Sequence, residues 1–293
     1  MRVLIVGCGY VGFPLATEMA RLGHEVYGLR RSAALKLQEA GITPLTADIT
    51  RPETLAALAG NFDWVINCVS SGGGDAEDYR KLYLEGTRNL IKWLAASPLK
   101  TFVYTSSTGV YGQNDGSLVD ETSLTEPATE TSKVLVETEK LLLAAAQKGF
   151  PAAIVRAAGI YGPGRGYLLK QFLRGEARIE GEGGRILNMI HRDDLIGVII
   201  AALERGQPGN IYNAVDDQPV TQRDFFKWLA GKLGQPMPPQ APTDAAITRR
   251  RGLTNKRISN RRLKTELAYE FKFPTFREGY LAEIQSPGDR RSD

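Results

Sequence analysis

Short runs of hydrophobic residues alternate with helical patterns along the first half of the chain. Runs that suit buried strands fall at residues 3–6, 24–29, 43–46, 64–69, 101–105 and 153–156. Between them, apolar residues recur with the spacing of amphipathic helices at residues 13–22, 33–40, 55–59, 76–96 and 133–149. Such alternation is typical of a parallel sheet, because parallel strands need a helical crossover. The sequence predicts an α/β fold of Rossmann type, with a doubly wound parallel sheet.

The regular alternation ends near residue 164. Helical patterns at residues 168–174, 193–205 and 221–233 and a strand at 210–213 follow it, separated by Gly-rich and Pro-rich stretches. We predict an NAD(P)-binding domain over residues 1–164, to which residues 190–214 return. We expect a smaller substrate-binding region from residues 165–189 and 215–284, and a flexible tail at 285–293.

A glycine-rich motif stands between the first strand and the first helix. The sequence Gly7-Cys8-Gly9-Tyr10-Val11-Gly12 matches G-x-G-x-x-G, and this position favours a dinucleotide site over an ordinary glycine turn. Gly7 permits a tight turn, Gly9 lets the backbone approach a pyrophosphate, and Gly12 lets the helix pack closely on the sheet. The helix N-terminus adds N–H donors for the phosphates. We expect Tyr10 and Val11 to contact the cofactor as well.

The end of the second strand favours NADP over NAD. NAD enzymes usually carry a carboxylate there, whereas this chain has Arg30, Arg31 and Ser32. The arginines could pair with a 2′-phosphate and Ser32 could add a hydrogen bond; the alternative is that both arginines are solvated at a strand end. Asp48 and Ile49 follow the third strand and could contact adenine, or Asp48 could cap a helix before Pro52. Ser70 could contact cofactor phosphate or ribose, or end the fourth strand.

Several segments of the chain match a known superfamily in order and spacing. They are Tyr104-Thr105-Ser106-Ser107-Thr108-Gly109-Val110-Tyr111-Gly112, Arg156 followed by Gly159-Ile160-Tyr161-Gly162-Pro163-Gly164, His191-Arg192-Asp193-Asp194, and Ile211-Tyr212-Asn213. With the glycine motif, they make the chain resemble the extended short-chain dehydrogenases/reductases, the superfamily of NAD-dependent epimerases and dehydratases. The resemblance implies a Rossmann fold, an NAD(P) cofactor and a homodimer.

The resemblance also implies catalytic roles. A Ser, a Tyr and a Lys do the chemistry in that superfamily: the Tyr exchanges a proton with the substrate, and the Lys lowers the Tyr pKa and binds the nicotinamide ribose. Ser107 and Lys133 fall on the Ser and Lys positions, but Thr129 stands on the Tyr position. A threonine hydroxyl cannot act as a base near neutral pH because its pKa is far above that of a phenol. The chain therefore resembles an atypical branch of the superfamily.

Other groups could replace the missing tyrosine. Glu130, Tyr111, Tyr161 and His191 are candidates, and each could equally be an ordinary packing or hydrogen-bonding residue. Sugar-nucleotide 4,6-dehydratases carry an Asp-Glu pair where this chain has Thr108 and Gly109, so the sequence argues against that dehydration.

Substrate contacts are less defined by the sequence. Thr108, Asn188 and Arg257 are our candidates, since family members build the pocket from the segments after Tyr-Gly-Pro-Gly and near the C-terminus. Basic residues at 249–264 suit an anionic substrate such as a nucleotide-sugar diphosphate, or form a solvated face.

Composition excludes some classes of function. The charged fraction of 24% and net charge of +4 are ordinary, and no aromatic residues interleave the late basic cluster, so we expect no nucleic-acid partner. No apolar run approaches the ~20 residues of a membrane helix, and we expect no membrane partner. Cys8 and Cys68 show neither disulfide nor metal-ligand spacing, which suits a cytoplasmic protein without a bound metal.

Three functions stay open at this point. The first is an NAD(P)-dependent oxidoreductase of a small carbonyl or sugar-like substrate. The second is a nucleotide-sugar epimerase that retains NAD tightly, and the third is a non-catalytic NAD(P)-binding sensor.

Overall fold

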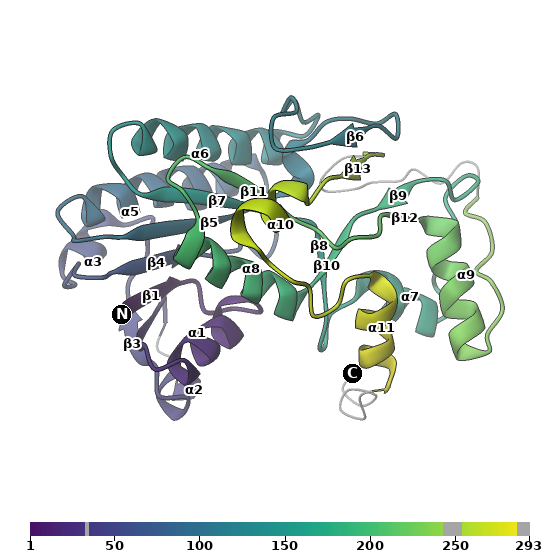
Figure 1. Cartoon of the computed structure of the whole chain (residues 1–293), viewed down its shortest axis with the longest axis horizontal. Helices are drawn as coiled ribbons and strands as arrows, with labels where there is room; N and C mark the ends of the chain where they lie inside the picture. Colours follow the sequence, from purple (N-terminus) through teal and green to yellow (C-terminus); the bar gives the residue numbers. More distant parts are fainter. Residues whose placement is uncertain (33–34, 243–253, 286–293) are drawn as a thin grey trace.

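The computed structural model describes residues 1–32, 35–242 and 254–285, and its main feature is a seven-stranded parallel sheet (Figure 1). The strand order is β11-β7-β5-β4-β1-β2-β3, which confirms the predicted doubly wound fold. The strands are β1 (Arg2–Val6), β2 (Glu25–Arg30), β3 (Thr43–Thr46), β4 (Trp64–Asn67), β5 (Thr101–Ser107), β7 (Ala152–Ala157) and β11 (Ile211–Ala214).

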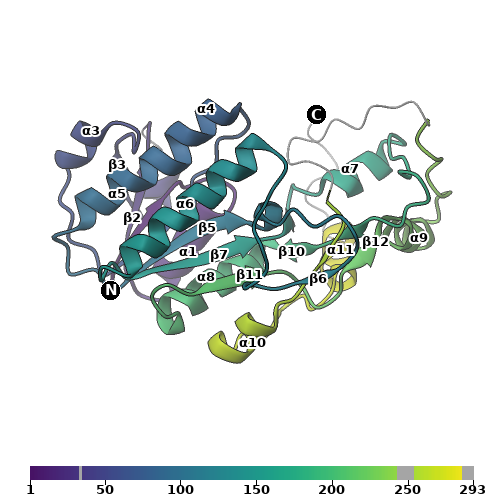
Figure 2. The same ribbon diagram turned by 90° about the horizontal axis from the view of Figure 1, so that it is seen from above.

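Helices cover both faces of this sheet. They are α1 (Gly12–Arg21), α2 (Leu35–Glu39), α3 (Pro52–Ala56), α5 (Gly86–Leu94), α6 (Glu130–Ala146) and α8 (Arg192–Arg205). Figures 1 and 2 show α5 and α6 on one face and α1 and α8 on the other. The segment predicted as one helix over residues 76–96 is continuous but not uniform: α4 (Ala76–Tyr79) passes through the π-helical turn η1 (Arg80–Glu85) into α5.

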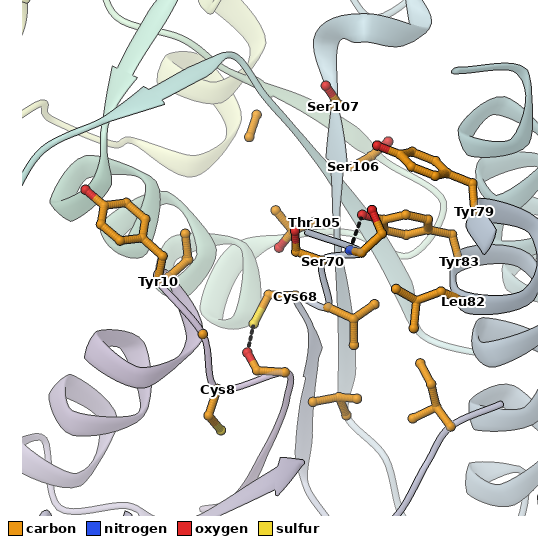
Figure 3. Close-up of a pocket in the computed structure, with 18 of the residues that line it drawn as sticks. Cys8, Tyr10, Cys68, Ser70, Tyr79, Leu82, Tyr83, Thr105, Ser106 and Ser107 are labelled. Atoms are coloured by element: carbon orange, nitrogen blue, oxygen red, sulfur yellow. Dashed lines mark hydrogen bonds between the residues drawn. The ribbon is translucent and has the colours of Figure 1, made fainter. Parts of the chain in front are cut away.

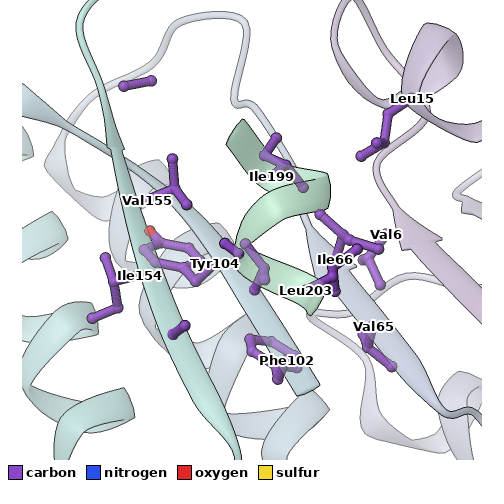
Figure 4. Close-up of a cluster of buried hydrophobic side chains, with 14 of the residues drawn as sticks. Val6, Leu15, Val65, Ile66, Phe102, Tyr104, Ile154, Val155, Ile199 and Leu203 are labelled. Atoms are coloured by element: carbon purple, nitrogen blue, oxygen red, sulfur yellow. The ribbon is translucent and has the colours of Figure 1, made fainter. Parts of the chain in front are cut away.

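The main core lies between the central strands and these helices. Val6, Ile66 and Phe102 of the sheet pack beside Leu15 of α1 and Ile199 of α8, and all five side chains are fully buried (Figure 4). A parallel sheet is buried on both faces, so its strands are continuous apolar runs rather than alternating ones. This burial explains why the apolar runs in the sequence marked the strands correctly.

A second, smaller hydrophobic cluster lies beyond one edge of the sheet. It joins α7 (Tyr167–Leu173), α9 (Gln222–Leu233) and α11 (Phe276–Gln285), with Phe172, Phe225 and Phe276 at its centre. Short strand pairs connect it to the sheet domain: β8 (Gly159–Tyr161) with β10 (Met189–His191), and β9 (Ile186–Leu187) with β12 (Val220–Thr221).

The last described segments return to the sheet domain. Strand β13 (Arg257–Ile258) pairs with β6 (Leu118–Val119), and α10 (Arg261–Leu267) packs on α8 and β11. The assignment of residues 165–189 and 215–284 to a substrate-binding region stays a prediction. Arg249, Arg250 and Arg251 of the basic cluster and the tail from residue 286 lie outside the described residues. None of the helices in the described ranges has both the length and the apolar character needed to cross a membrane.

Candidate functional site

A cleft of about 930 Å³ lies along the carboxyl ends of the sheet strands, where ligands bind in open parallel sheets. Its walls come from the turns after β1, β2, β3 and β4, from the ends of β5 and β7, and from the helix that contains η1. Figure 3 shows the part of this cleft between Cys8 and Ser107. The predicted site residues that line it are Gly7, Gly9, Tyr10, Val11, Arg30, Arg31, Ser32, Asp48, Ile49, Ser70 and Ser107.

The three glycines of the β1–α1 turn are needed for three different reasons. Gly7 has a φ of +93°, and a Cβ there would lie 2.9 Å from the backbone of Val69. A Cβ on Gly12 would lie 2.0 Å from the Gly7 carbonyl oxygen, so any side chain would push α1 off the turn. No atom lies within 4 Å of a Cβ placed on Gly9. The backbone at Gly9 therefore leaves open space in the cleft, as the approach of a pyrophosphate requires.

The two cysteines lie behind this turn and are free thiols. The Cys68 thiol donates to the Gly7 carbonyl at 3.2 Å (Figure 3). Burial raises the pKa of both thiols, that of Cys8 to about 11. Both stay protonated near neutral pH, so they pack against the turn rather than act as nucleophiles.

One end of the cleft is basic. Arg30, Arg31 and Ser32 are exposed at the end of β2, beside Asp48 and Ile49 of the loop after β3. The Asp48 carboxylate accepts hydrogen bonds from the backbone and hydroxyl of Thr50, at 2.9 and 2.8 Å. Asp48 thus stabilises its own loop, and the N-cap of α3 is instead Arg51, with no side-chain cap.

The other end of the cleft is formed by two serines at the end of β5. The Ser107 hydroxyl accepts from the backbone N of Gly109 at 3.1 Å, in the short 3₁₀ helix η2 (Thr108–Val110). The Ser106 hydroxyl donates to Glu139 at 2.6 Å, and Glu139 forms a buried ion pair with Arg156, also at 2.6 Å. This buried network fixes the strand end that presents both hydroxyls.

Two tyrosines of the helix after β4 line the same end. Tyr79 and Tyr83 stand one turn apart, with ring centroids 4.9 Å from each other. The Tyr83 hydroxyl accepts from the backbone N of Ser71 at 3.1 Å, whereas Figure 3 shows the Tyr79 hydroxyl turned toward Ser106. On the opposite side of the cleft the Tyr10 hydroxyl is buried, and burial raises its pKa to about 12. Tyr79 is therefore the phenol best placed to meet a ligand at the end of β5.

Comparison with known proteins places this cleft in a family. A sequence model of the NAD dependent epimerase/dehydratase family matches residues 3–214. The chain is a member of this family. Protein YeeZ of Escherichia coli K12 is 29% identical over 281 residues, which cover 93% of this chain and 96% of YeeZ.

Two further relatives span nearly the whole chain. The 3-diazoavenalumate denitrifying reductase of a Streptomyces species is 26% identical over 310 residues, covering 95% of this chain and 99% of the reductase. A solved structure from Methylobacillus flagellatus, described as a candidate NAD-dependent epimerase/dehydratase, is 34% identical with a TM-score of 0.77. That match covers 97% of this chain and 99% of the other.

Thr129 and Lys133, which we predicted to stand on the Tyr and Lys positions of the superfamily, do not line the cleft. Thr129 is the N-cap of α6, and its hydroxyl accepts from the backbone N of Ser132 at 3.4 Å. The Lys133 ammonium donates to Glu130 at 2.7 Å, and the Lys133 side chain is 51% exposed. The α6 residue that reaches the cleft wall is Leu135. The catalytic roles of Thr129 and Lys133 stay predictions that this arrangement does not support.

The other candidates for proton transfer are buried outside the cleft lining. Tyr111 bonds to Asn213 at 2.8 Å and accepts from Arg156 at 2.7 Å. Tyr161 stacks on Tyr280 of α11, with ring centroids 4.2 Å apart. Tyr111 thus makes internal hydrogen bonds and Tyr161 packs against Tyr280, in line with the alternative interpretation of each.

His191 also has a structural role, as the N-cap of α8. Its Nδ1 accepts from the backbone N of Asp193 at 3.2 Å, which caps α8, and its Nε2 lies 3.4 Å from Glu283 of α11. Burial lowers the pKa of His191 to about 4, so the ring is neutral at physiological pH.

The proposed substrate residues are spread over the molecule. Asn188 donates to the Lys256 carbonyl at 2.9 Å and accepts from the backbone N of Ile258 at 3.0 Å, so it holds β13 in place. Arg257 lines a separate pocket of about 410 Å³ beside Trp228. Thr108 is buried next to Ser107 without lining the cleft. Asn188 thus lies beside the backbone on either side of Arg257, but none of the three residues lines the cleft, and their roles stay predictions.

Sequence reasoning did not single out several residues that line the cleft, among them Tyr79, Arg165 and Tyr167. The spacing of Tyr79 and Tyr83 was a usable signal, because residues four apart share a helix face. Arg165 and Tyr167 lie in the predicted substrate-binding region of residues 165–189, but no pattern in the sequence singled them out within it.

Proposed function

We propose that the chain is an NADP-dependent oxidoreductase that interconverts a carbonyl and an alcohol on a small substrate. The observation that carries this proposal is a single cleft with an open glycine turn, a basic end at Arg30 and Arg31, and hydroxyls of Ser107 and Tyr79 at the other end. The denitrifying reductase among its relatives supports a reductive reaction in this fold.

The residues at the glycine turn and at the end of β2 fit an NADP molecule. Gly9 leaves the room that a pyrophosphate needs, and α1 starts at Gly12, so its N–H groups point toward that space. Arg30 and Arg31 would hold the 2′-phosphate, because a guanidinium forms paired hydrogen bonds to phosphate oxygens. Bound NADPH would supply the hydride that reduction of a carbonyl requires.

At the reacting end, the chain's own residues would handle the proton. Tyr79 would donate its phenolic proton to the carbonyl oxygen while Ser107 donates a hydrogen bond to the same oxygen. The carbonyl carbon gains a hydride and its oxygen a proton, so the product is an alcohol. Water would then return a proton to the Tyr79 phenolate.

A non-catalytic dinucleotide-binding protein is the second candidate function. The observation that favours it is the placement of Lys133, which is paired with Glu130, and of Thr129, which caps α6, while the glycine turn is complete. Cofactor binding without turnover of any carbonyl compound would support this candidate.

The experiment that tests the proposal is a paired titration with NADPH and NADH, followed by thermal stabilisation. A ligand at a hundred times its Kd adds ~2.7 kcal/mol of stability. We expect NADPH to bind more tightly than NADH, and Arg30→Glu to weaken NADPH binding roughly tenfold or more without weakening NADH. Arg174→Glu is the matched control, since Arg174 is exposed at the end of α7, outside the cleft lining.

Other outcomes would point elsewhere. Equal affinity for the two nucleotides, unchanged in Arg30→Glu, would contradict the NADP assignment. NAD released from the purified, denatured protein would favour the nucleotide-sugar epimerase. A protein that neither holds nor binds either nucleotide would contradict the proposed function itself.

A further inference from the structure

Arg165 stands in the wall of the cleft on a rigid turn. The backbone N of Gly162 donates to the Arg165 carbonyl, and the Arg165 N donates back to Gly162, both at 2.8 Å. The two residues between them, Pro163 and Gly164, complete a tight hairpin, in which Gly164 has a φ of +70°. The backbone position of Arg165 is therefore fixed at the start of the second region of the molecule.

The Arg165 side chain is also held in place. Its guanidinium carbon lies 5.0 Å from the ring centroid of Tyr10, a cation–π contact that favours this position of the charge. Arg192 approaches the same ring at 5.4 Å, but Arg192 is neutralised by Asp193 through hydrogen bonds of 2.9 and 3.0 Å.

Arg165 keeps its charge available to a ligand. Within the described part of the chain, no carboxylate forms an ion pair with Arg165, and it is exposed. Glu283 is another carboxylate near Tyr10, and its Oε1 lies 3.4 Å from Nε2 of His191. A cation–π contact uses none of the N–H donors of the guanidinium, and these can serve a ligand in the cleft that Arg165 lines.

Tyr167 provides a second donor beside it. Its side chain lines the same cleft and is 73% exposed. The Tyr167 hydroxyl accepts a hydrogen bond from Gln171 at 2.8 Å, so its own proton is left to donate to a ligand.

We propose that Arg165 and Tyr167 bind an anionic group of the substrate, a carboxylate or a phosphate, at the mouth of the cleft. The substrate class is then a carbonyl compound that carries one such anion, and this class rests on the proposed reductase function. A guanidinium supplies two parallel N–H donors and a phenol supplies one O–H donor. The oxygens of a carboxylate or a phosphate accept hydrogen bonds from both. Arg165, Tyr79 and Ser107 line one cleft, so one substrate can meet all three.

The test measures anion binding by calorimetry on the full chain saturated with NADP⁺. The probes are oxamate and inorganic phosphate, with oxamide as the neutral counterpart of oxamate. We expect at least one anion to bind, and Arg165→Gln to weaken it roughly tenfold or more, because a charge-assisted hydrogen bond is lost. Tyr167→Phe should weaken it less, and Arg174→Gln not at all. Oxamide should bind weakly, with no dependence on Arg165.

Three outcomes would overturn the proposal. They are the absence of binding by either anion to the wild-type protein, unchanged anion affinity in Arg165→Gln, and a loss of NADP⁺ affinity in that variant as large as the loss of anion affinity. The last would make Arg165 a contact of the cofactor phosphates. The anion titrations are repeated without NADP⁺. If the protein fails to bind cofactor, the proposed function is contradicted, but these titrations still test the anion site.

Discussion

At the scale of single residues, Tyr10, Tyr79 and Tyr83 line the cleft besides Tyr167, and their hydroxyls have different surroundings. Tyr83 is held by the backbone of Ser71, and Tyr10 is buried with a raised pKa. Tyr79 is different because its hydroxyl turns toward Ser106 at the end of β5 (Figure 3). In the proposed reaction this phenol takes over the proton transfer that Thr129 cannot perform.

We predict that Tyr79→Phe lowers kcat about 100-fold or more, the usual contribution of a general acid, and leaves the Kd for NADPH unchanged. The measurement is steady-state reduction of a carbonyl compound that the wild-type protein turns over, alongside an NADPH titration. Tyr27→Phe is the control, since it removes a phenol hydroxyl of β2 outside the cleft. Full activity in Tyr79→Phe would assign the proton to another group.

The residues of the glycine turn could be predicted because the motif is contiguous in the sequence. Gly7, Gly9 and Gly12 are constrained by backbone geometry that depends only on a strand followed directly by a helix. Tyr79 and Arg165 could not be predicted in this way. Each reaches the cleft from a different region of the chain, so its role depends on packing that no local pattern records.

At the scale of elements, helix α6 carries two glutamates with opposite environments. Glu139 faces the sheet and pairs with Arg156, and these side chains are 3% and 4% exposed. Glu137 faces outward and pairs with Arg80, and these side chains are 43% and 44% exposed. In both pairs two arginine nitrogens donate to the glutamate, so the two ion pairs differ mainly in their burial.

We predict that Glu139→Gln lowers the free energy of unfolding by about 3 kcal/mol or more, because it leaves the Arg156 charge buried without its partner. Glu137→Gln should lower it by about 0.5 kcal/mol or less, since an exposed pair is weak in water. Urea unfolding of both variants measures the difference. Equal losses would mean that the Ser106–Glu139–Arg156 network does not stabilise the end of β5.

The sequence missed helices α10 and α11, and it also missed strands that are short or depend on distant pairing. Strands β9, β12 and β13 have two residues each, which is too few for a hydrophobic pattern to show. β13 forms only because Arg257 pairs with Leu118, far away in the chain. The central strands β1 and β4 were predictable because burial on both faces makes each one a continuous apolar run.

At the scale of the whole molecule, two hydrophobic clusters meet beside the cleft. The main cluster supports the glycine turn and the end of β5, while Arg165 and Tyr167 belong to the segment that leads into the second cluster. His191 lies where the two clusters meet, with its ring centroid 5.3 Å from that of Tyr161 and 4.1 Å from that of Phe273. One contact between α11 and the sheet domain runs through this imidazole, whose Nε2 lies 3.4 Å from Glu283.

We predict that protonation of His191 destabilises the fold as the pH falls. Its Nδ1 must be unprotonated to accept from the backbone N of Asp193, and burial lowers its pKa from 6.5 to about 4, with Asp193 favouring the charged form and Arg192 and Lys272 opposing it. The unfolded chain binds this proton between about pH 6.5 and 4 while the folded chain does not, so the free energy of unfolding falls over that window, by up to about 3 kcal/mol. The measurement compares urea unfolding of the wild-type protein and His191→Asn, which keeps a capping side chain. Burial raises the pKa of Asp194, an effect common to both proteins that cancels in the difference. If the two stability curves run parallel from pH 7 to 4, His191 does not control this contact.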